Sequence, residues 1–388
     1  MDLTEYKIGD IYDSASGISK SAGEFGFGYP FLPFKTVFAN SYLPEHLPEL
    51  ANTTEYEREK CSIKYGDIFL TRTSETLGEL GMSSVALKDY DNATFNGFTK
   101  RLRKKKDCDI AIEPKYLIYY FRSKEFRKKI TSMASLTTRA SLNNDMIARL
   151  PLLLPDIEIQ RKIGNYLYDI DEKIKINQSI NILLEKKMWA IYTHTFHNSH
   201  TDKKTLGEVT ERITERIGSR EATVLSAVYT GCLEPSDEHF NKRVYSKDIS
   251  KYIVVEEGNF AYNPARVNIG SIGINDLGVC GCVSPVYVAF KTEINYRAFF
   301  KFYFKTEVFK EECKKKAFGS VRQSLRYDDF ANITIDYPDS EKAEEFERRW
   351  IRINEIIKSN DCQSEQLTHL KEILFDNFFS GTIDPNAL

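Results

Sequence analysis

The side chains of this sequence best suited to chemistry are basic and amide groups that could bind nucleic acid. Six of the seven residues in Lys100–Lys106 are cations. Lysine and arginine neutralise DNA phosphates, which gives sequence-independent affinity that weakens with salt. We expect a basic loop here. The run could equally be the solvated surface of a hairpin, and the sequence leaves both interpretations open.

Two further groups of polar side chains follow apolar segments that resemble turn-and-strand units. Thr71–Thr73 follow Gly66–Leu70, and Asn263, Arg266 and Asn268 follow Gly258–Tyr262. Arginine and asparagine make the two-pronged hydrogen bonds that distinguish guanine and adenine. Turn formation alone would also explain the asparagines. Arg139 and Arg322 occupy equivalent places, where they would bind phosphate or pin a strand to a helix by a salt bridge. The candidate DNA-binding residues are Thr71, Arg72, Thr73, Lys100, Arg101, Arg103, Lys104, Lys105, Lys106, Arg139, Asn263, Arg266, Asn268, Arg322 and Gln323.

Catalytic interpretations fare worse. Asn263–Arg266 begins like the Asn/Asp-Pro-Pro-aromatic loop of amino-methyltransferases, but it lacks the second proline and the ring that stacks on a flipped base. Phe25–Gly28 is better explained as a turn than as a cofactor loop. His194, His197 and His200 fall where a helix gives way to a linker. We therefore predict no catalytic residue, no metal site and no cofactor.

The composition is that of an ordinary globular protein. The 388 residues are 41% hydrophobic and 28% charged, enough for two or three domains. No apolar run reaches 18 residues, the N-terminus has no signal-peptide pattern, and seven scattered cysteines favour a reducing compartment. We expect a cytoplasmic protein. The net charge of −2 is an objection to DNA binding, although it can hide local basic patches.

An internal repeat organises the chain. Tyr119–Phe126 returns as Phe302–Phe309, and Ser141-Leu142 returns as Ser324-Leu325, at a constant offset of 183 residues. The two turn-and-strand units are instead 192 residues apart, so the globular parts have diverged by insertions and deletions. A duplicated module favours a pseudo-two-fold axis, which suits a target with two halves such as duplex DNA.

Each half is predicted to be a β-rich globular part followed by a long helix. Lys115–Ile130 and Tyr296–Lys316 have the pattern of amphipathic helices that pack on the sheets. Pro155-Asp156 and Pro338-Asp339 have the proline and acidic residues that favour a helix start. A helix from about residue 156 to 197 would be roughly 60 Å long at ~1.5 Å per residue, long enough to act as a ruler.

The long helices carry heptad seams, which predicts that they pack together. The first seam comprises residues 163, 170, 177, 184 and 191 with 167, 174, 181, 188 and 195, and the second comprises residues 346, 353, 360, 367 and 374 with 350, 357, 364, 371 and 378. Polar residues interrupt both seams near their middles, at Asn177 and Asn360. The first helix carries the chain away from the first globular part, so the second helix must run back for the two seams to meet. We therefore expect antiparallel pairing, which brings the central asparagines near one another.

The segments Leu150–Ile163 and Asp169–Asn177 resemble the conserved regions of type I restriction-modification specificity subunits. The similar features are an apolar strand ending in proline, a Glu-x-Gln helix start and an Asp-x-Lys-Ile-x-x-Asn centre. The second copy is weaker, since Glu341-Lys342-Ala343 stands where the family often has Glu-x-Gln. This departure puts the second contact with partner subunits in doubt.

The resemblance implies a non-catalytic protein of mixed α+β (α/β) class, with two target-recognition domains joined by two long antiparallel coiled-coil helices. The expected parts are recognition domains at 1–154 and 199–337 and conserved helical regions at 155–198 and 338–388. Each domain would read half of a bipartite double-stranded DNA site, while the helices set the spacer and dock two methyltransferase (modification) subunits, with restriction subunits in the full complex. Two alternatives stay open: a stand-alone DNA-binding scaffold or regulator, and a divergent enzyme.

Overall fold

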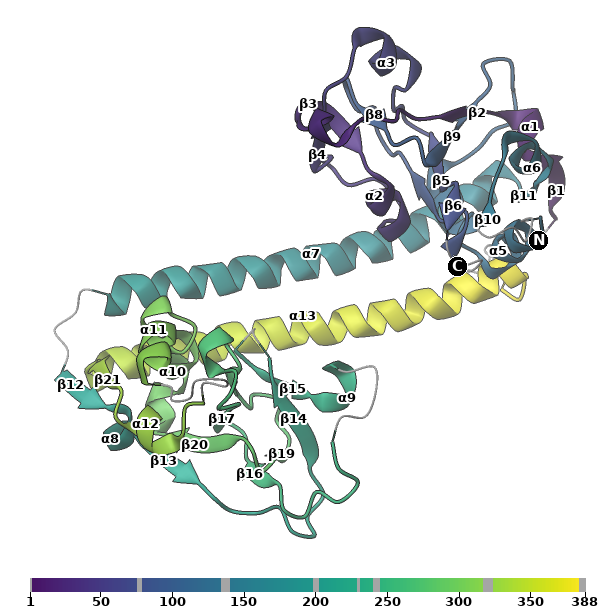
Figure 1. Cartoon of the computed structure of the whole chain (residues 1–388). Helices are drawn as coiled ribbons and strands as arrows, with labels where there is room; N and C mark the ends of the chain where they lie inside the picture. Colours follow the sequence, from purple (N-terminus) through teal and green to yellow (C-terminus); the bar gives the residue numbers. More distant parts are fainter. Residues whose placement is uncertain are drawn as a thin grey trace. The chain divides into compact units, whose positions relative to one another are not determined.

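The computed structural model describes residues 2–74, 79–133, 140–197, 202–228, 231–239, 245–316 and 324–383. The chain forms two compact units of mixed α+β structure, as predicted (Figure 1). Unit 1 comprises Met1–Asn177 and Asp361–Leu388, and unit 2 comprises Gln178–Asn360. No helix of the described residues has the length and apolarity that crossing a membrane requires.

Unit 1 contains a four-stranded antiparallel sheet whose central strand follows the Gly66 turn. Gly66 has φ of +82°, a left-handed conformation that glycine adopts without strain. The sheet order is β2 (Tyr12–Ser16), β9 (Thr99–Lys104), β5 (Ile68–Thr71) and β7 (Ser83–Val85). A second sheet has the order β4 (Glu49–Ala51), β3 (Phe25–Leu32) and β8 (Thr94–Phe95). Two-stranded pairs join β1 (Thr4–Lys7) to β11 (Pro151–Leu154) and β6 (Thr73–Ser74) to β10 (Ala140–Ser141). β5 is buried, as the sequence predicted.

Unit 2 has the corresponding sheet around its own turn, where Gly258 has φ of +81°. Its order is β13 (Thr210–Ile213), β20 (Val288–Thr292), β17 (Phe260–Tyr262) and β18 (Ile272–Ile274). The second sheet has the order β15 (Leu233–Pro235), β14 (Thr223–Ala227), β19 (Gly281–Val283) and β16 (Ile253–Val255). β12 (Asp202–Thr205) pairs with β21 (Thr334–Tyr337). The buried strand β17 confirms the second turn-and-strand prediction.

Short helices alternate with these strands along the chain. In unit 1 they are α1 (Ile8–Ile11), α2 (Phe34–Ala39), α3 (Glu55–Lys60), α4 (Pro114–Tyr120), α5 (Lys124–Met133) and α6 (Asn144–Arg149). In unit 2 they are α8 (Leu206–Val209), α9 (Ser236–His239), α10 (Arg297–Tyr303), α11 (Glu307–Lys316) and α12 (Tyr327–Ala331). Single turns of 3₁₀ helix lie at Ala22–Glu24, Val267–Ile269 and Ile294–Tyr296.

The prediction of one continuous amphipathic helix in each half was wrong, because each is broken into two. In unit 1 the break precedes α5, where the Ser123 hydroxyl accepts the Phe126 N–H at 3.2 Å. In unit 2 Thr306 accepts the Phe309 N–H in the same way, also at 3.2 Å. A hydroxyl that satisfies a free amide three residues later starts a new helix. The repeat therefore preserves the break as well as the helices.

The two long helices are α7 (Ile157–Phe196) and α13 (Ser340–Ser380), which begin after the two predicted proline–aspartate pairs. The predicted seam residues are all buried or half-buried along both helices. In unit 1, Ile163 and Leu167 share a core with Leu374 and Phe378. In unit 2, Met188 and Tyr192 share a core with Phe346 and Trp350. Cross-helix contacts run from Asp171–Lys371 to Asn177–Gln363 in unit 1 and from Asn181–Asn360 to Tyr192–Phe346 in unit 2, which confirms antiparallel pairing within each unit.

Polar side chains interrupt the seam in each unit. In unit 1, the Asn177 amide donates to Gln363 Oε1 at 2.9 Å and to Ser364 Oγ at 3.3 Å. In unit 2, the Asn360 amide donates to Asn181 Oδ1 at 2.8 Å. The predicted polar break is thus a set of hydrogen-bonded pairs across the seam.

Candidate functional site

In unit 1, the end of strand β5 separates a buried threonine from an exposed arginine. The Thr71 hydroxyl accepts the Met82 N–H at 2.8 Å and donates to the Glu79 carbonyl at 3.3 Å, so this buried side chain holds the local chain together. Arg72 is exposed, and its carbonyl accepts the Leu142 N–H at 2.9 Å. Thr73 is half-buried on β6, paired with Ser141 of β10. Arg72 is therefore the side chain that this strand end presents.

A second cation strengthens the positive charge around Arg72. Lys100 is only 6% exposed, and its ammonium donates to Ser16 Oγ at 2.7 Å. Burial lowers the pKa of Lys100, and the neighbouring charge of Arg72 lowers it further. Neither cation forms an ion pair with any carboxylate of the described residues. Two cations without a counter-charge form a place that attracts an anion such as a phosphate.

The expectation that Lys100–Lys106 forms a basic loop was wrong, because most of the run is strand β9. The Arg101 guanidinium donates to the Ser62 carbonyl at 2.6 Å. The Arg103 guanidinium donates two hydrogen bonds, of 2.7 and 2.6 Å, to the buried Asp67 carboxylate. Lys105 donates to the Gly9 carbonyl at 2.6 Å. The exposed Lys104 and Lys106 are the cations of this run that the described residues leave accessible.

In unit 2, Asn263 directly follows strand β17 and shapes the chain beyond it. Its Oδ1 accepts the Ala265 N–H at 3.0 Å, so the side chain stabilises a turn. Among the described residues, the amide nitrogen and a second lone pair on Oδ1 have no other partner. Arg266 is exposed, and Asn268 lies half-buried in the 3₁₀ turn that follows. The three residues follow one strand end, as predicted.

A cavity of about 460 Å³ adjoins Asn263 and gathers residues from distant parts of unit 2. Its polar lining includes Arg212, Asn263, Ser324, Arg326, Tyr327 and Asp328. The Leu325 N–H donates to the Pro264 carbonyl at 3.0 Å. This bond holds the segment that begins at Ser324 against the chain just beyond β17. The Arg212 guanidinium carbon lies 5.5 Å from the centre of the Tyr327 ring. The cavity thus combines hydrogen-bond donors, a ring and a net positive charge.

Arg212 and Arg326 were absent from the sequence prediction. Both are exposed, and neither is in an ion pair within the described part of the chain. Arg326 directly follows Ser324-Leu325, the second copy of Ser141-Leu142, so the repeat itself pointed to its place. No sequence signal marked Arg212, because β13 is far from the cavity's other residues along the chain. Arg139, Arg322 and Gln323 lie outside the described residues.

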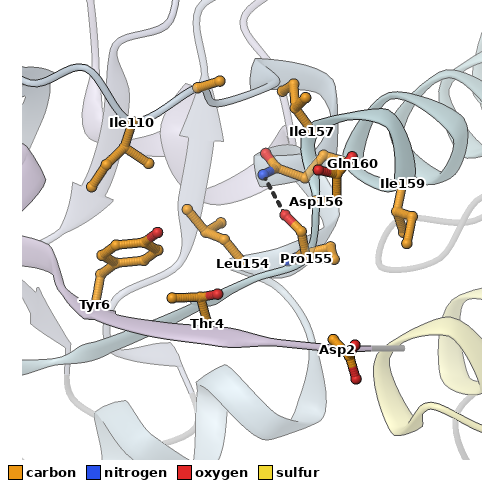
Figure 2. A pocket seen from close by; sticks show the side chains of 11 residues that line it. Asp2, Thr4, Tyr6, Ile110, Leu154, Pro155, Asp156, Ile157, Ile159 and Gln160 are labelled. Atoms are coloured by element: carbon orange, nitrogen blue, oxygen red, sulfur yellow. Dashed lines mark hydrogen bonds between the residues drawn. The ribbon is translucent and has the colours of Figure 1, made fainter.

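A second cavity, of about 650 Å³, lies beside the start of α7 in unit 1 and is bordered by the segment that resembles the specificity subunits. Figure 2 shows the Gln160 amide donating to the Pro155 carbonyl, a bond of 2.9 Å. Gln160 is 2% exposed, and its Oε1 accepts the Glu113 N–H at 3.1 Å. This glutamine therefore joins the helix start to the segment before α4. Among the described residues, no cluster of acidic, histidine and cysteine side chains could hold a metal ion.

Comparison with known proteins agrees with this geometry. Residues 2–186 match the model of the type I restriction modification DNA specificity domain. The chain is 21% identical over 399 aligned residues to a protein assigned as the MjaX type I restriction enzyme specificity subunit of Methanocaldococcus jannaschii, covering 95% of this chain and 90% of that protein. It is 29% identical over 202 residues to the HindI type I restriction enzyme specificity subunit of Haemophilus influenzae, covering 50% of this chain and 41% of that protein.

Among solved structures, the fold is similar to the type I restriction-modification system S subunit from M. genitalium. The TM-score is 0.64 with 13% sequence identity, and the match covers 97% of this chain and 95% of the other. The similarity therefore extends over both units and both long helices.

Proposed function

We propose that this chain, which belongs to the family of type I restriction-modification specificity subunits, recognises a bipartite DNA target, one half with each globular part. The observation that carries the proposal is the repeated strand-end arrangement. Arg72 and Pro264 each accept a main-chain hydrogen bond from the repeated leucine, Leu142 or Leu325. Exposed arginines lie beside both bonds, and arginine is the side chain that most often reads guanine.

The recognition domains are residues 1–154 and 199–337 in this proposal. Within them, Arg72, Arg212 and Arg326 are the strongest candidates for base or phosphate contacts, joined by Lys104, Lys106, Asn263 and Arg266. Lys100, Arg101 and Arg103 stabilise the fold, because their cationic groups already donate to acceptors of the protein. Their charge still adds to the local positive potential.

The helical regions, residues 155–198 and 338–388, set the spacer and bind two modification subunits, with restriction subunits joining the full complex. The chain itself is non-catalytic. S-adenosylmethionine, ATP and magnesium belong to the partner subunits in this assignment.

The test is to express the chain with the modification subunits of the same system and to map methylated adenines across a genome. We expect methylation at a two-part sequence with an unspecified spacer. Exchanging residues 1–154 for the corresponding part of another specificity subunit should change one half of the target and leave the other half intact. A change in both halves would contradict independent readout.

The isolated chain provides the control. It should bind DNA and transfer no methyl group. DNA binding without any association with a modification subunit would favour the stand-alone scaffold, and methyl transfer by the chain alone would favour an enzyme.

A further inference from the structure

Both tryptophans of the chain, Trp189 and Trp350, line one cavity in unit 2. The cavity has a volume of about 270 Å³ and is otherwise lined by Glu185, Lys186, Phe302 and Lys305. Helix α7 provides three of these residues, and α13, α10 and the turn after α10 provide the others. None of them belongs to the candidate DNA-binding surface.

Three aromatic rings form an apolar wall. Trp189 stacks on Phe302 with ring centres 5.5 Å apart and planes at 27°. Trp350 meets the same phenyl ring edge-on, at 5.4 Å and 80°. Trp350 is buried, whereas Trp189 is 38% exposed at the mouth of the cavity. Such ring-lined hollows are the usual receptors for a single anchoring side chain in a protein interface.

Lys305 gives the cavity a cation without a partner. Its Nζ lies 5.9 Å from the centre of the Phe302 ring, and among the described residues it has no hydrogen bond and no ion pair. The neighbouring Lys301, in contrast, is paired with Asp276 at 2.5 Å. Burial lowers the pKa of Lys305, as expected for an ammonium group kept from water, although the nearby charges of Glu185 and Asp276 act in the opposite direction.

The internal repeat shows that this free cation is a departure from the other half. Arg122 is the residue equivalent to Lys305 at the offset of 183. Its guanidinium donates to the Ser83 carbonyl at 2.6 Å and to the Asn40 carbonyl at 2.9 Å. The positions equivalent to Trp189 and Trp350 hold Glu372 and Leu167. The corresponding positions of unit 1 therefore lack both tryptophans, and their cation is hydrogen-bonded.

The charges at the rim favour an acidic occupant. Lys186 and Lys305 contribute two positive charges and Glu185 contributes one negative charge. An apolar side chain continues the helix face of Trp189, since Ile182 precedes it by two helical turns and is 55% exposed. The cavity is smaller than the roughly 300–1,000 Å³ of small-molecule sites, which favours a side chain over a cofactor.

We propose that this cavity receives an apolar side chain together with an adjacent carboxylate, both presented by the modification subunit that docks on unit 2. The apolar group lies against Trp189, Phe302 and Trp350, while the carboxylate binds Lys305. This inference rests on the proposed function, because it supposes that the modification subunit binds the helices. It adds a specific anchor, and it makes the two docking surfaces unequal.

The first test uses small probes and the full chain. Because both tryptophans line the cavity, their intrinsic fluorescence reports on its occupant. We expect 3-phenylpropionate to bind about tenfold more tightly than the neutral 3-phenylpropanamide, the gain expected from a charge-assisted hydrogen bond. Lys305→Met should remove the difference, and Lys187→Met, which changes an exposed lysine on α7, should keep it. Equal affinities for the two probes in the unaltered chain would overturn the proposed chemistry.

The second test uses the modification subunit of the same system. Lys305→Glu should weaken its binding by about tenfold or more, while Lys247→Glu, which changes an exposed lysine outside both helical regions, leaves it unchanged. An excess of 3-phenylpropionate should compete with the subunit in the unaltered chain. Lys305→Met, which keeps the apolar packing, should weaken binding less than Lys305→Glu, so that misfolding of one variant does not decide the result.

The outcomes separate the two proposals. If the unaltered chain fails to bind the modification subunit, the proposed function is wrong. If the unaltered chain binds, and both Lys305 variants bind equally well without competition from the probe, only the anchor is wrong.

Discussion

The side-chain amide of Asn360 donates a 2.8 Å hydrogen bond to the side-chain carbonyl of Asn181 across the seam between α13 and α7. Asn181 also donates to the Ile357 carbonyl at 3.4 Å. A polar pair at such positions costs stability compared with leucine, but it fixes which residues face each other. The Asn181–Asn360 pair therefore fixes the register between α7 and α13 and lowers the stability of their packing.

Replacing one member of this pair should be worse than replacing both. Asn360→Leu alone leaves Asn181 facing an apolar side chain, which should cost about 1–3 kcal/mol of the free energy of unfolding. The double variant Asn181→Leu with Asn360→Leu should recover this loss and exceed the unaltered chain in stability, while favouring extra oligomers. Urea unfolding with light scattering measures both effects. Additive losses in the double variant would show that the two residues are not coupled.

Asp171 holds the globular part of unit 1 to its helix pair. Its carboxylate accepts the Tyr119 hydroxyl at 2.7 Å and binds the Lys371 ammonium at 2.6 Å. Asp171→Ala leaves both partners unsatisfied, so we expect a loss of about 1–3 kcal/mol in urea unfolding. Asp376→Ala is the control, because its ion pair with Lys124 is exposed and should hardly matter. Equal effects of the two substitutions would contradict this role.

Glu347 should make unit 2 sensitive to pH. Burial raises the pKa of its carboxyl above the ordinary 4.5, although the Ala298 N–H, Arg297 and Lys301 act in the opposite direction. The folded chain therefore holds this proton more tightly than the unfolded chain does. Stability from this group is present below pH 4.5 and falls as the pH rises through the folded-state pKa.

Glu347→Gln should flatten that fall, because glutamine keeps an acceptor for the Ala298 N–H, now bonded at 2.5 Å, but does not ionise. At pH 7 the variant should be at least as stable as the unaltered chain. Thermal unfolding between pH 4.5 and 7 measures the slope. The exposed Glu344→Gln is the matched control and should keep the original slope. A steeper fall in stability with rising pH for Glu347→Gln would show that folding lowers the pKa of Glu347 and does not raise it.

The exposed arginines should act on separate halves of the target. Arg72→Gln should weaken recognition of one half-site and Arg326→Gln of the other, each by about 1–3 kcal/mol if the arginine reads a base. A phosphate contact would instead weaken binding to all sequences and lower the salt dependence. Binding to DNAs with single-base changes at several salt concentrations separates these cases. Arg348→Gln, on α13, should leave DNA binding unchanged, and an identical effect would point to a general charge effect.

Helix length should set the spacer between the half-sites. One heptad inserted between Asn177 and Asn181 of α7, and one between Asn360 and Ser364 of α13, keeps the seam in phase. Seven residues add about 10 Å at ~1.5 Å per residue, which corresponds to roughly three base pairs at about 3.4 Å each. Methylation mapping should show a longer spacer between unchanged half-sites. Full activity with the original spacer would show that the helices do not measure the target.

The sequence was most informative where local rules decide the structure. The Gly66 and Gly258 turns, the helix starts after Pro155 and Pro338, and the heptad seams depend on neighbouring residues, and all were predicted correctly. The break before α5 was also readable, because Ser123 and Thr306 can each cap a new helix. It was missed because the apolar periodicity continues through it.

The sequence was least informative where partners are distant along the chain. Lys100, Arg101 and Arg103 look like a solvated basic run until Ser16, Ser62 and Asp67 are known to bind them. Likewise, Arg212 joins Asn263 and Arg326 only through the folding of three separate segments. Composition and spacing do not contain those long-range pairings, so the cations that face solvent could not be chosen in advance.

The bond from Leu325 to Pro264 uses main-chain atoms alone, as does the bond from Leu142 to Arg72. Any residue has a carbonyl, so the equivalent position just beyond each buried strand can change its side chain without giving up this bond. Arginine occupies the position in one half and proline in the other. Evolution can therefore vary the chemistry presented there while the framework persists, and new preferences for target sequence can arise by single substitutions without a new fold.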